Sequence, residues 1–179
     1  GEGEYKAKIE GKMTRVYMVW THIFERCYNE NVRYKYPTYK NTTICEEWHN
    51  FQNFAKWYSE NYIEGYFLDK DLKQMNSENK IYSPDTCVFI SRKINNFIAT
   101  DYSNNTSGSV GVQNYKNGTS FRASSRYFEN GKQKHIGSYA TEEEASNAYS
   151  NFRKEQCEIA KQYMRDLGYY SEEIIQLIK

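Results

Sequence analysis

Two acidic residues separated by a single residue, Asp69 and Asp71, are the candidates for metal chemistry in this chain of 179 residues. Carboxylate oxygens are the ligands that magnesium and manganese prefer, so the pair is a candidate divalent-metal site. The same Asp-x-Asp spacing also occurs in plain turns, which need no metal. Lys70, between them, carries an ammonium group that is protonated at neutral pH unless strongly desolvated, so it cannot take a proton from water. His22 and His49 fall among aromatic residues in predicted helices, where packing or surface roles are more common than catalysis.

A second candidate chemistry is contact with nucleic acid through residues 31–40, where basic residues alternate with tyrosines. Tyrosine rings stack on bases and cations neutralise phosphates, so this segment predicts DNA contacts by Arg33 and Lys35. Pro37 excludes a continuous helix, and we expect an extended basic-aromatic loop. An equally favoured alternative is that the tyrosines pack on neighbouring helices while the cations reach solvent.

Beyond residue 109 the apolar pattern takes a period of two, which is typical of strands. The three predicted strands are 110–115, 120–127 and 133–139. Asn-Gly pairs separate them, which predicts two hairpins and therefore a three-stranded antiparallel sheet. On the second strand Arg122, Ser124 and Arg126 share one face, and the opposite face is left to meet a helix.

The sheet segment is locally basic although the whole chain is not. Between residues 109 and 139, Glu129 is the single acidic residue, and the basic residues are Lys116, Arg122, Arg126, Lys132 and Lys134. A local excess of this size is a usable footprint for DNA phosphates.

Short motifs in the second half resemble the Apetala-two, or ethylene-response-factor, DNA-binding domain over about fifty residues. They are Gly111-Val112, Phe121, Ala123, Gly131-Lys132, His135-Ile-Gly-Ser-Tyr139, Thr141-Glu-Glu-Glu-Ala145 and Ala148-Tyr149. The resemblance implies a three-stranded sheet laid into the major groove of DNA with a helix packed behind it. Sheet readout is physically reasonable because the major groove admits a β-ribbon and presents a distinct pattern for each base pair.

The resemblance also assigns positions that contact bases. They fall on Gln113, Tyr115, Ser124, Arg126, Gln133 and His135. Plant-type members commonly place Arg or Trp at several of these positions, whereas Arg126 is the only Arg in this set. Arg122 adds to the basic face, and we assign phosphate contacts to Lys132 and Lys134.

Four runs in the first half carry a second resemblance: Cys45-Glu-Glu-Trp48, Phe51-Gln-Asn-Phe54, Leu68-Asp-Lys-Asp71 and Asn79-Lys-Ile-Tyr-Ser-Pro-Asp-Thr-Cys87. They resemble phage and mobile-element proteins grouped with HNH endonucleases and their degenerate DNA-binding relatives, which often carry an Apetala-type domain downstream. In a working HNH site a His acts as general base beside an acidic metal ligand. Lys70 stands at the position of that His, so the nuclease chemistry is expected to be lost or rewritten.

Helical periodicity marks the remaining elements, at 14–30, 46–60, 141–163 and 171–178. The polar run after Ala99 contains no core-forming residue and is predicted to be a linker. We therefore expect an HNH-like module at 1–98 that includes the basic-aromatic loop, a linker at 99–108, and an Apetala-type domain with C-terminal helices at 109–179. The expected fold class is α+β, with a mostly helical N-terminal module and a C-terminal three-stranded antiparallel sheet packed on a helix.

Composition bounds the functional class. The 24 Lys and Arg residues nearly balance 23 Asp and Glu residues, so whole-chain charge favours neither a nucleic-acid binder nor an acidic mimic. The mean hydropathy of −0.94 leaves no stretch apolar enough to span a bilayer. The four cysteines are widely spaced, which predicts free thiols in a reducing compartment, and we expect the cytoplasm of a bacterial host cell.

These observations predict a double-stranded DNA-binding protein of phage or mobile-element type, without a cofactor or enzymatic activity. One alternative is an HNH- or homing-type endonuclease that uses Asp69 or Asp71 with magnesium or manganese. Another is a phage protein that inhibits a host protein by direct contact, for which the near-neutral net charge is support. The target sequence and the oligomeric state do not follow from the residues.

Overall fold

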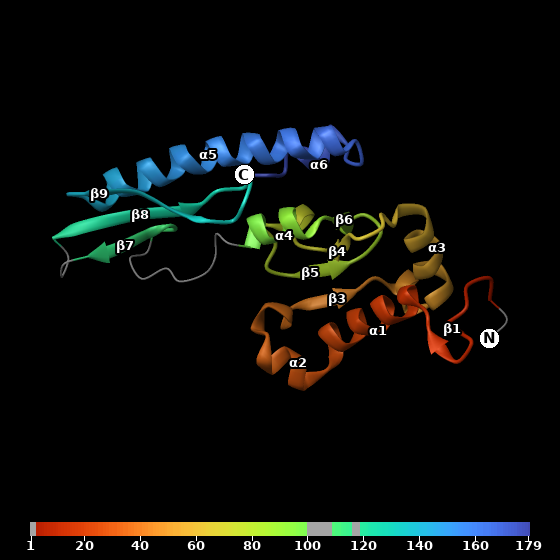
Figure 1. The fold of residues 1–179 in the computed structure, drawn as a ribbon. Coiled ribbons are helices and arrows are strands. Elements are labelled where there is room, and N and C mark those ends of the chain that lie inside the picture. Colours follow the sequence, from red (N-terminus) through yellow and green to blue (C-terminus); the bar gives the residue numbers. More distant parts are fainter. Residues whose placement is uncertain (1–2, 100–108, 116–118) are drawn as a thin grey trace. The chain divides into compact units, whose positions relative to one another are not determined.

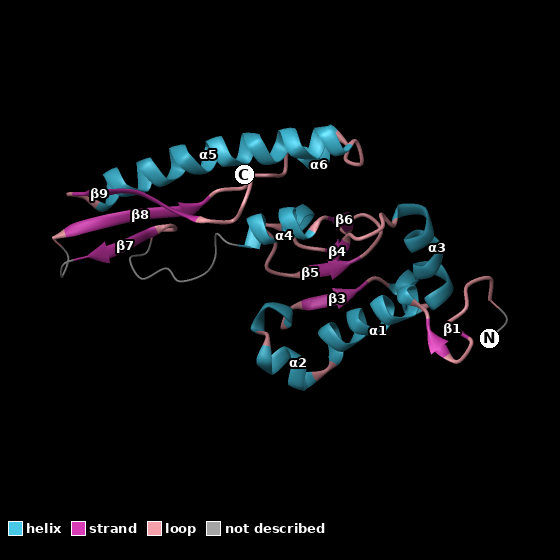
Figure 2. Ribbon diagram, in the orientation of Figure 1, coloured by secondary structure: helices cyan, strands magenta, loops and turns pink. Residues whose placement is uncertain are grey.

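The computed structural model describes residues 3–99, 109–115 and 119–179. The chain divides into two compact units between Ser91 and Arg92, and each is described by itself (Figure 1). Both units combine helices with small separate sheets, which confirms the α+β class (Figure 2).

The first long helix of the N-terminal unit, α1 (Arg15–Tyr28), lies where the periodicity predicts it. The hydroxyl of Thr14 accepts a hydrogen bond from the Tyr17 N–H and caps the helix, because a Thr oxygen replaces the partner that the first N–H groups lack. Ile23 and Cys27 face the core and are 1% exposed.

The prediction of an extended loop over 31–40 is wrong. The segment forms a short helix, α2 (Glu30–Lys35), and then a 3-10 turn, η1 (Pro37–Tyr39). The side chain of Asn29 accepts hydrogen bonds from two backbone N–H groups and starts α2, whereas Pro37 ends regular helix and begins the 3-10 turn. A local cap therefore outweighs the basic-aromatic alternation.

The helix predicted over 46–60 is two elements. A 3-10 turn, η2 (Glu46–His49), precedes α3 (Phe51–Asn61). Asn50 stands between them in extended conformation, and its side chain accepts a hydrogen bond from the Gln52 N–H as the cap of α3. Asn competes with helix continuation in this way because its short side chain bonds nearby backbone.

Short strands complete the N-terminal unit. They are β1 (Lys8–Ile9), β2 (Lys12–Met13), β3 (Thr42–Ile44), β4 (Phe67–Asp69), β5 (Lys80–Tyr82) and β6 (Val88–Ile90), with a 3-10 turn, η3 (Leu72–Gln74), after β4. β1 pairs with β2 and β4 with β6 in antiparallel fashion, whereas β3 and β5 are parallel. The parallel pair joins residues 38 positions apart, a long-range contact that periodicity does not reveal.

The core of this unit is built from aromatic rings. Trp48, Phe54, Tyr58, Tyr82 and Phe89 are all less than 10% exposed and pack in one cluster. Edge-to-face and stacked ring pairs stabilise such clusters beyond the area they bury. Much of the high aromatic content therefore has a packing role.

The C-terminal unit contains the predicted three-stranded antiparallel sheet. Its strands are β7 (Val112–Tyr115), β8 (Ser120–Arg126) and β9 (Gln133–Tyr139), in the order β7-β8-β9. Gly111 precedes β7 with φ of +74°, and a Cβ there would lie 2.1 Å from the ring of Tyr149. Both the backbone angle and the close approach of the ring require glycine at this position.

A long helix, α5 (Glu142–Leu167), runs along one face of the sheet (Figure 1). Thr141 and Glu144 form the predicted capping box. Ala145, fully buried, lets the helix approach Val112 and Ala123 of the sheet closely. The last predicted helix is shorter than expected, since α6 covers only Glu172–Ile175 after the cap Ser171.

One helix of the C-terminal unit, α4 (Arg92–Ala99), was not predicted. It belongs to this unit through Phe97, whose ring lies 5.2 Å edge-on from Phe128. The guanidinium of Arg153 lies 3.6 Å from the centre of the Phe97 ring, and one of its N–H groups donates to the Phe97 carbonyl. Lys93 of α4 also contacts Phe128, with its ammonium 4.4 Å from the centre of the ring.

The observed division at 91/92 places α4 with the C-terminal unit, ahead of the predicted linker at 99–108. Residues 100–108 lie outside the described residues, so the linker stays a prediction. All four cysteines are free thiols, as expected. None of the helices in the described ranges is both long and apolar enough to cross a membrane.

The packing of α4 makes a testable prediction. In the fragment Arg92–Lys179, Phe97→Ala should lower the free energy of unfolding by about 3 to 5 kcal/mol, because a buried ring is removed and Arg153 loses its partner. Urea denaturation measures this change. The control Ile159→Ala removes a half-exposed side chain of α5 and should cost under about 1 kcal/mol. Equal losses in the two variants would show that α4 does not belong to this unit.

Candidate nucleic-acid interface

The strand register places the predicted base-contacting residues on one face of the C-terminal sheet. Across the strands Arg122 lies opposite Gln113, Ser124 opposite His135, and Arg126 opposite Gln133. Tyr115, two residues after Gln113, shares that face because side chains alternate along a strand. The opposite face carries Val112, Ala123 and their neighbours against α5. We call the face that carries the candidate base-contacting residues the outer face. Its members are Gln113, Tyr115, Arg122, Ser124, Arg126, Gln133 and His135.

An irregularity in β9 is needed for this arrangement. The register shifts between Ala123 and Ser124, so that Gly137 pairs with Ala123 while His135 pairs with Ser124. Ile136 is the extra residue of a β-bulge. Because of it, Tyr139 and Ile136 both pack on the helix side, while His135 points to the outer face.

Arg122 and Tyr115 form a stacked pair on the outer face. The guanidinium carbon of Arg122 lies 4.5 Å from the centre of the Tyr115 ring, and the Tyr115 side chain is 44% exposed. Such a cation–π contact holds the partly buried Arg122 side chain against the Tyr115 ring, which keeps an exposed surface. The pair can therefore stack on or donate to a ligand that covers the sheet.

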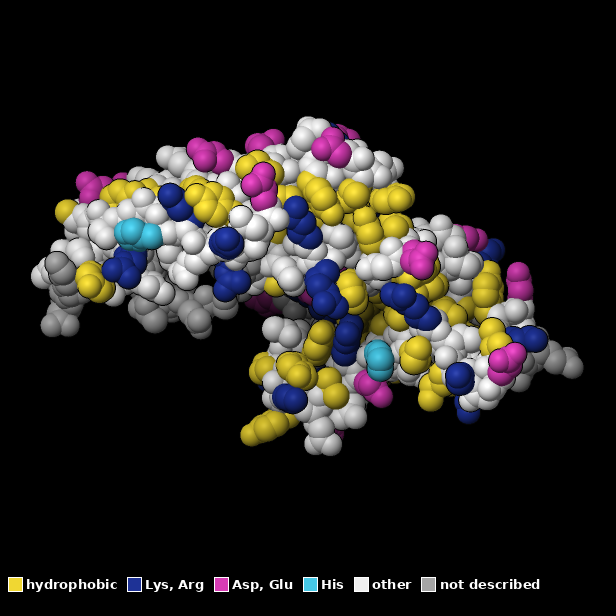
Figure 3. All heavy atoms as spheres, viewed as in Figure 1, with side chains coloured by type: hydrophobic (Ala, Val, Ile, Leu, Met, Phe, Trp, Pro, Cys, Tyr) yellow, Lys and Arg dark blue, Asp and Glu magenta, His cyan; other side chains and the backbone are white. Residues whose placement is uncertain are grey.

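The charges of this unit are segregated. No Asp or Glu occurs in the described strands β7, β8 and β9, whereas three glutamates, Glu142–Glu144, occupy the first turn of α5. On the face drawn in Figure 3, acidic side chains gather along α5 and basic ones lie over the strands. Arg126 is exposed at the end of β8 and is positioned to contact a polyanion.

The two lysines predicted to contact phosphates lie differently. Lys134 is exposed but pairs with Ser125, so it belongs to the helix side at the start of β9 and not to the outer face. Lys132 precedes β9 in the turn, where its N–H donates to the side chain of Asn130. Both can reach a backbone that passes beside the sheet, but neither is placed to read bases.

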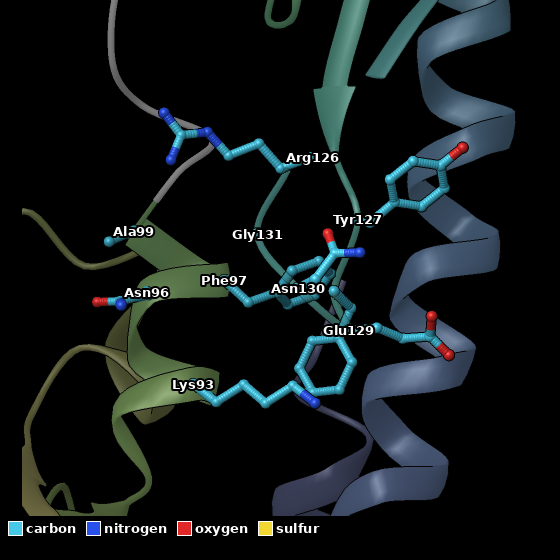
Figure 4. A pocket seen from close by; sticks show the side chains of 10 residues that line it. Lys93, Asn96, Phe97, Ala99, Arg126, Tyr127, Glu129, Asn130 and Gly131 are labelled. Carbon is cyan, nitrogen blue, oxygen red and sulfur yellow. The ribbon is translucent and has the colours of Figure 1, made fainter. Parts of the chain in front are cut away.

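A cavity of about 640 Å³ adjoins Arg126 at one end of the sheet. Figure 4 shows its lining side chains, which come from α4 on one side and from the connection between β8 and β9 on the other. Lys93 and Asn96 of α4 are polar members of this lining that sequence analysis did not single out. The helical spacing of Ile94, Phe97 and Ile98 is the signal that marks α4 in the sequence.

The Asp69–Lys70–Asp71 turn forms a closed set of ion pairs and hydrogen bonds. One oxygen of Asp69 accepts from the N–H groups of Asp71 and Leu72, at 2.9 and 2.7 Å. The ammonium of Lys70 lies 2.8 and 3.0 Å from the two carboxylate oxygens of Asp71, and Lys80 binds the same carboxylate. Asp69 therefore serves as a turn-forming acceptor and Asp71 as a counter-ion.

Burial and charge set the pKa values in this turn. Burial raises the pKa of Asp69, against the opposing effect of its two N–H donors. Burial would raise the pKa of Asp71 as well, but the ammonium groups of Lys70 and Lys80 outweigh it and hold that pKa below its usual value. Lys70 is only 3% exposed, and its ammonium lies 5.1 Å from the ring centre of Tyr39.

This turn is poorly suited to a metal ion. The two ammonium groups make three hydrogen bonds to the Asp71 carboxylate, and a divalent cation beside Lys70 would meet like charge. Within the described ranges, no cluster of three or more His, Cys, Asp or Glu residues could hold a metal ion. Nearby Cys87 is inert, because burial raises the pKa of its thiol to about 12.

The candidate residues in the first helices differ in their exposure and in their contacts. Arg33 is half-buried, and its guanidinium donates to the carbonyl of Lys40. Lys35 is exposed, with its ammonium 5.2 Å from the ring centre of Tyr36. His22 and His49 are exposed, and the ring nitrogens of His49 contact the Tyr28 hydroxyl and the carbonyl of Cys45.

Comparisons of this chain with protein-family models, with curated proteins and with solved structures found no match. The two family resemblances therefore remain predictions, and the geometry of the residues carries the functional argument.

The ion pairs of Asp71 predict a pH-dependent loss of stability. Asp71→Asn should lower the free energy of unfolding at pH 7 by about 2 kcal/mol, less than a fully buried pair because this side chain is 44% exposed. The folded-state pKa lies below the unfolded value of about 3.9, so the stabilisation is complete above that value and is lost as pH falls through the folded pKa.

Unfolding of both proteins between pH 5 and pH 3 measures this effect. The wild type should lose stability more steeply with acid than Asp71→Asn does. Asp85→Asn, which changes an exposed carboxylate in the turn after β5, is the matched control. Its free energy of unfolding should follow that of the wild type to within about 0.5 kcal/mol over this pH range. Parallel acid curves for wild type and Asp71→Asn would contradict the assignment.

Proposed function

We propose that this protein binds double-stranded DNA and reads the major groove with the outer face of β7-β8-β9. The observation that carries the proposal is the outer face itself: polar and basic side chains in register, no carboxylate on the described strands, and a helix behind them. The resemblance to Apetala-type domains and to HNH-related phage proteins supports the same function. The site of action that fits is the DNA of a bacterial host cell.

The donors and acceptors of the outer face suit base edges. The planar fork of Arg126 can pair with the two acceptors of guanine, and the amides of Gln113 and Gln133 can pair with adenine. The Arg122–Tyr115 pair presents an aromatic plane and a fixed cation beside them. Lys132, Lys134 and Lys93 lie off this face and suit phosphates, which position a protein without specifying sequence.

The arrangement around Lys70 does not favour the endonuclease alternative. A general base must accept a proton, whereas the Lys70 side chain donates to both carboxylate oxygens of Asp71. We expect no metal-dependent cleavage and no requirement for magnesium or manganese. No contact among the described residues favours inhibition of a host protein over DNA binding.

Arg126→Ala should weaken binding to a selected duplex by about 1 to 3 kcal/mol and relax discrimination at one base pair. Lys134→Ala, which removes an equal charge from the helix side, should weaken binding to all sequences alike. Selection of a site from random duplexes, followed by titration on that site and on a scrambled one at two salt concentrations, separates these effects. If Arg126→Ala changed neither affinity nor base preference, the outer face would not be the reader.

Incubation of supercoiled plasmid with the protein and either magnesium or manganese should give no nicking above background. The reason is that Lys70 stands at the position that the HNH resemblance gives to the proton-accepting His, and an ammonium group cannot accept a proton. Nicking that Asp69→Ala or Asp71→Ala abolishes would establish the endonuclease instead. A misfolded preparation is excluded by showing that the same batch binds duplex DNA.

A further inference from the structure

A second cavity, of about 370 Å³, lies in the N-terminal unit and is rich in hydrogen-bond donors. Its polar lining includes Arg33, Lys40, Asn41, Thr43, Asn79 and Lys80. The cavity lies beside the start of the parallel pair β3 and β5, which holds residues 42 and 80 opposite one another. Its volume falls within the range of about 300 to 1000 Å³ that is usual for ligand sites.

The charge of this cavity is positive. Arg33, Lys40 and Lys80 contribute three cations, and none of the described lining residues is acidic. Asp71 binds Lys80, but the same carboxylate also binds Lys70, so these three groups together keep a net positive charge. The cavity therefore attracts an anion.

Two of the three cations, Arg33 and Lys80, are held in place before any ligand arrives. The guanidinium of Arg33 donates to the carbonyl of Lys40, which ties α2 to the chain that enters β3. The backbone N–H of Lys80 donates to the Asn41 carbonyl at 3.1 Å, and its side chain is held by Asp71. Because groups that are already ordered lose little entropy on binding, the site is pre-organised.

The mixture of donors suits phosphate better than a carboxylate. A guanidinium fork can bind two phosphate oxygens side by side, and lysine ammonium groups bind the others as point charges. The Thr43 hydroxyl and the Asn41 and Asn79 amides add neutral donors. A flat carboxylate with two oxygens would leave several of these donors without a partner.

We infer that this cavity binds a phosphate group, and that the phosphate belongs to a DNA backbone. The second half of the inference rests on the proposed function. One more cation, Lys35, is exposed at the end of α2, two residues after Arg33, and a nucleic acid offers repeated phosphates to cations that lie near one another. The N-terminal unit then adds a phosphate contact to the base reading of the sheet.

The first arm of the test uses inorganic phosphate and the full chain. In NMR titration, the backbone amides of 41–43 and 79–81 should shift saturably, and Arg33→Gln/Lys40→Gln should abolish those shifts. Lys8→Gln/Lys12→Gln, which removes two exposed lysines from β1 and β2, is the charge-matched control and should shift as the wild type does. Shifts scattered over all lysines, or unchanged in the cavity variant, would overturn the site.

The second arm measures duplex DNA binding. The cavity variant should bind about tenfold or more weakly than the control, with the slope of log affinity against log salt reduced by about 1. Lys40→Gln alone, which keeps the Arg33 contact to the backbone carbonyl, should show part of the loss if the double variant is poorly folded. A cavity variant equal to the control, when Arg126→Ala still weakens binding, overturns the cavity and leaves the sheet proposal standing.

A third arm distinguishes the source of the phosphate. Deoxyadenosine monophosphate should bind no more than a few-fold better than inorganic phosphate if the cavity serves a DNA backbone. Much tighter binding of the nucleotide, with duplex binding unaffected by the cavity variant, would overturn the DNA assignment in favour of a free nucleotide.

Discussion

The bulge at Ile136 is the constraint on which the C-terminal sheet depends. In a regular strand His135 and Tyr139 would point to the same face, since they are four positions apart. Packing requires Tyr139 on the helix side, where it pairs with Phe121 and joins the small core, whereas the proposed DNA recognition needs His135 and Gln133 on the other side. One extra residue opposite Ala123 meets both demands. The hydrophobic core and the proposed DNA surface are therefore coupled through a single backbone irregularity.

Lys70 has a comparable position in the N-terminal unit. A buried ammonium is costly unless it is paired, and here it bonds both oxygens of Asp71 and faces two tyrosine rings. The same carboxylate holds Lys80 at the edge of the second cavity. In the sequence, Asp69 and Asp71 suggest a metal site. In the structure, the carboxylate of Asp71 instead binds the ammonium groups of Lys70 and Lys80 and holds them in place.

The sequence predicts the elements whose signals are local. The Asn-Gly turns, the Thr141 capping box and the alternation around Arg122 sufficed for the sheet and for α5, and the alternation put Arg122, Ser124 and Arg126 on one face. The prediction of a loop at 31–40 was wrong because the cap residue Asn29 starts a helix there. The parallel pairing of β3 with β5, the bulge and the cavity around Arg33 depend on contacts between distant residues, which no period in the sequence encodes.

The near-zero net charge of the whole chain, which by itself does not favour DNA binding, has a specific consequence when the charges are segregated. Glutamates of α5 offset the cations of the outer face, and Asp71 offsets part of the basic cluster near the second cavity. Long-range attraction to any polyanion is therefore weak, because fields of opposite sign cancel beyond about a Debye length of 8 to 10 Å. Non-specific DNA binding depends mainly on that attraction, whereas base contacts act only at close range. A protein arranged in this way has to obtain its affinity from correct sites, which favours a high ratio of specific to non-specific binding over tight binding to DNA in general.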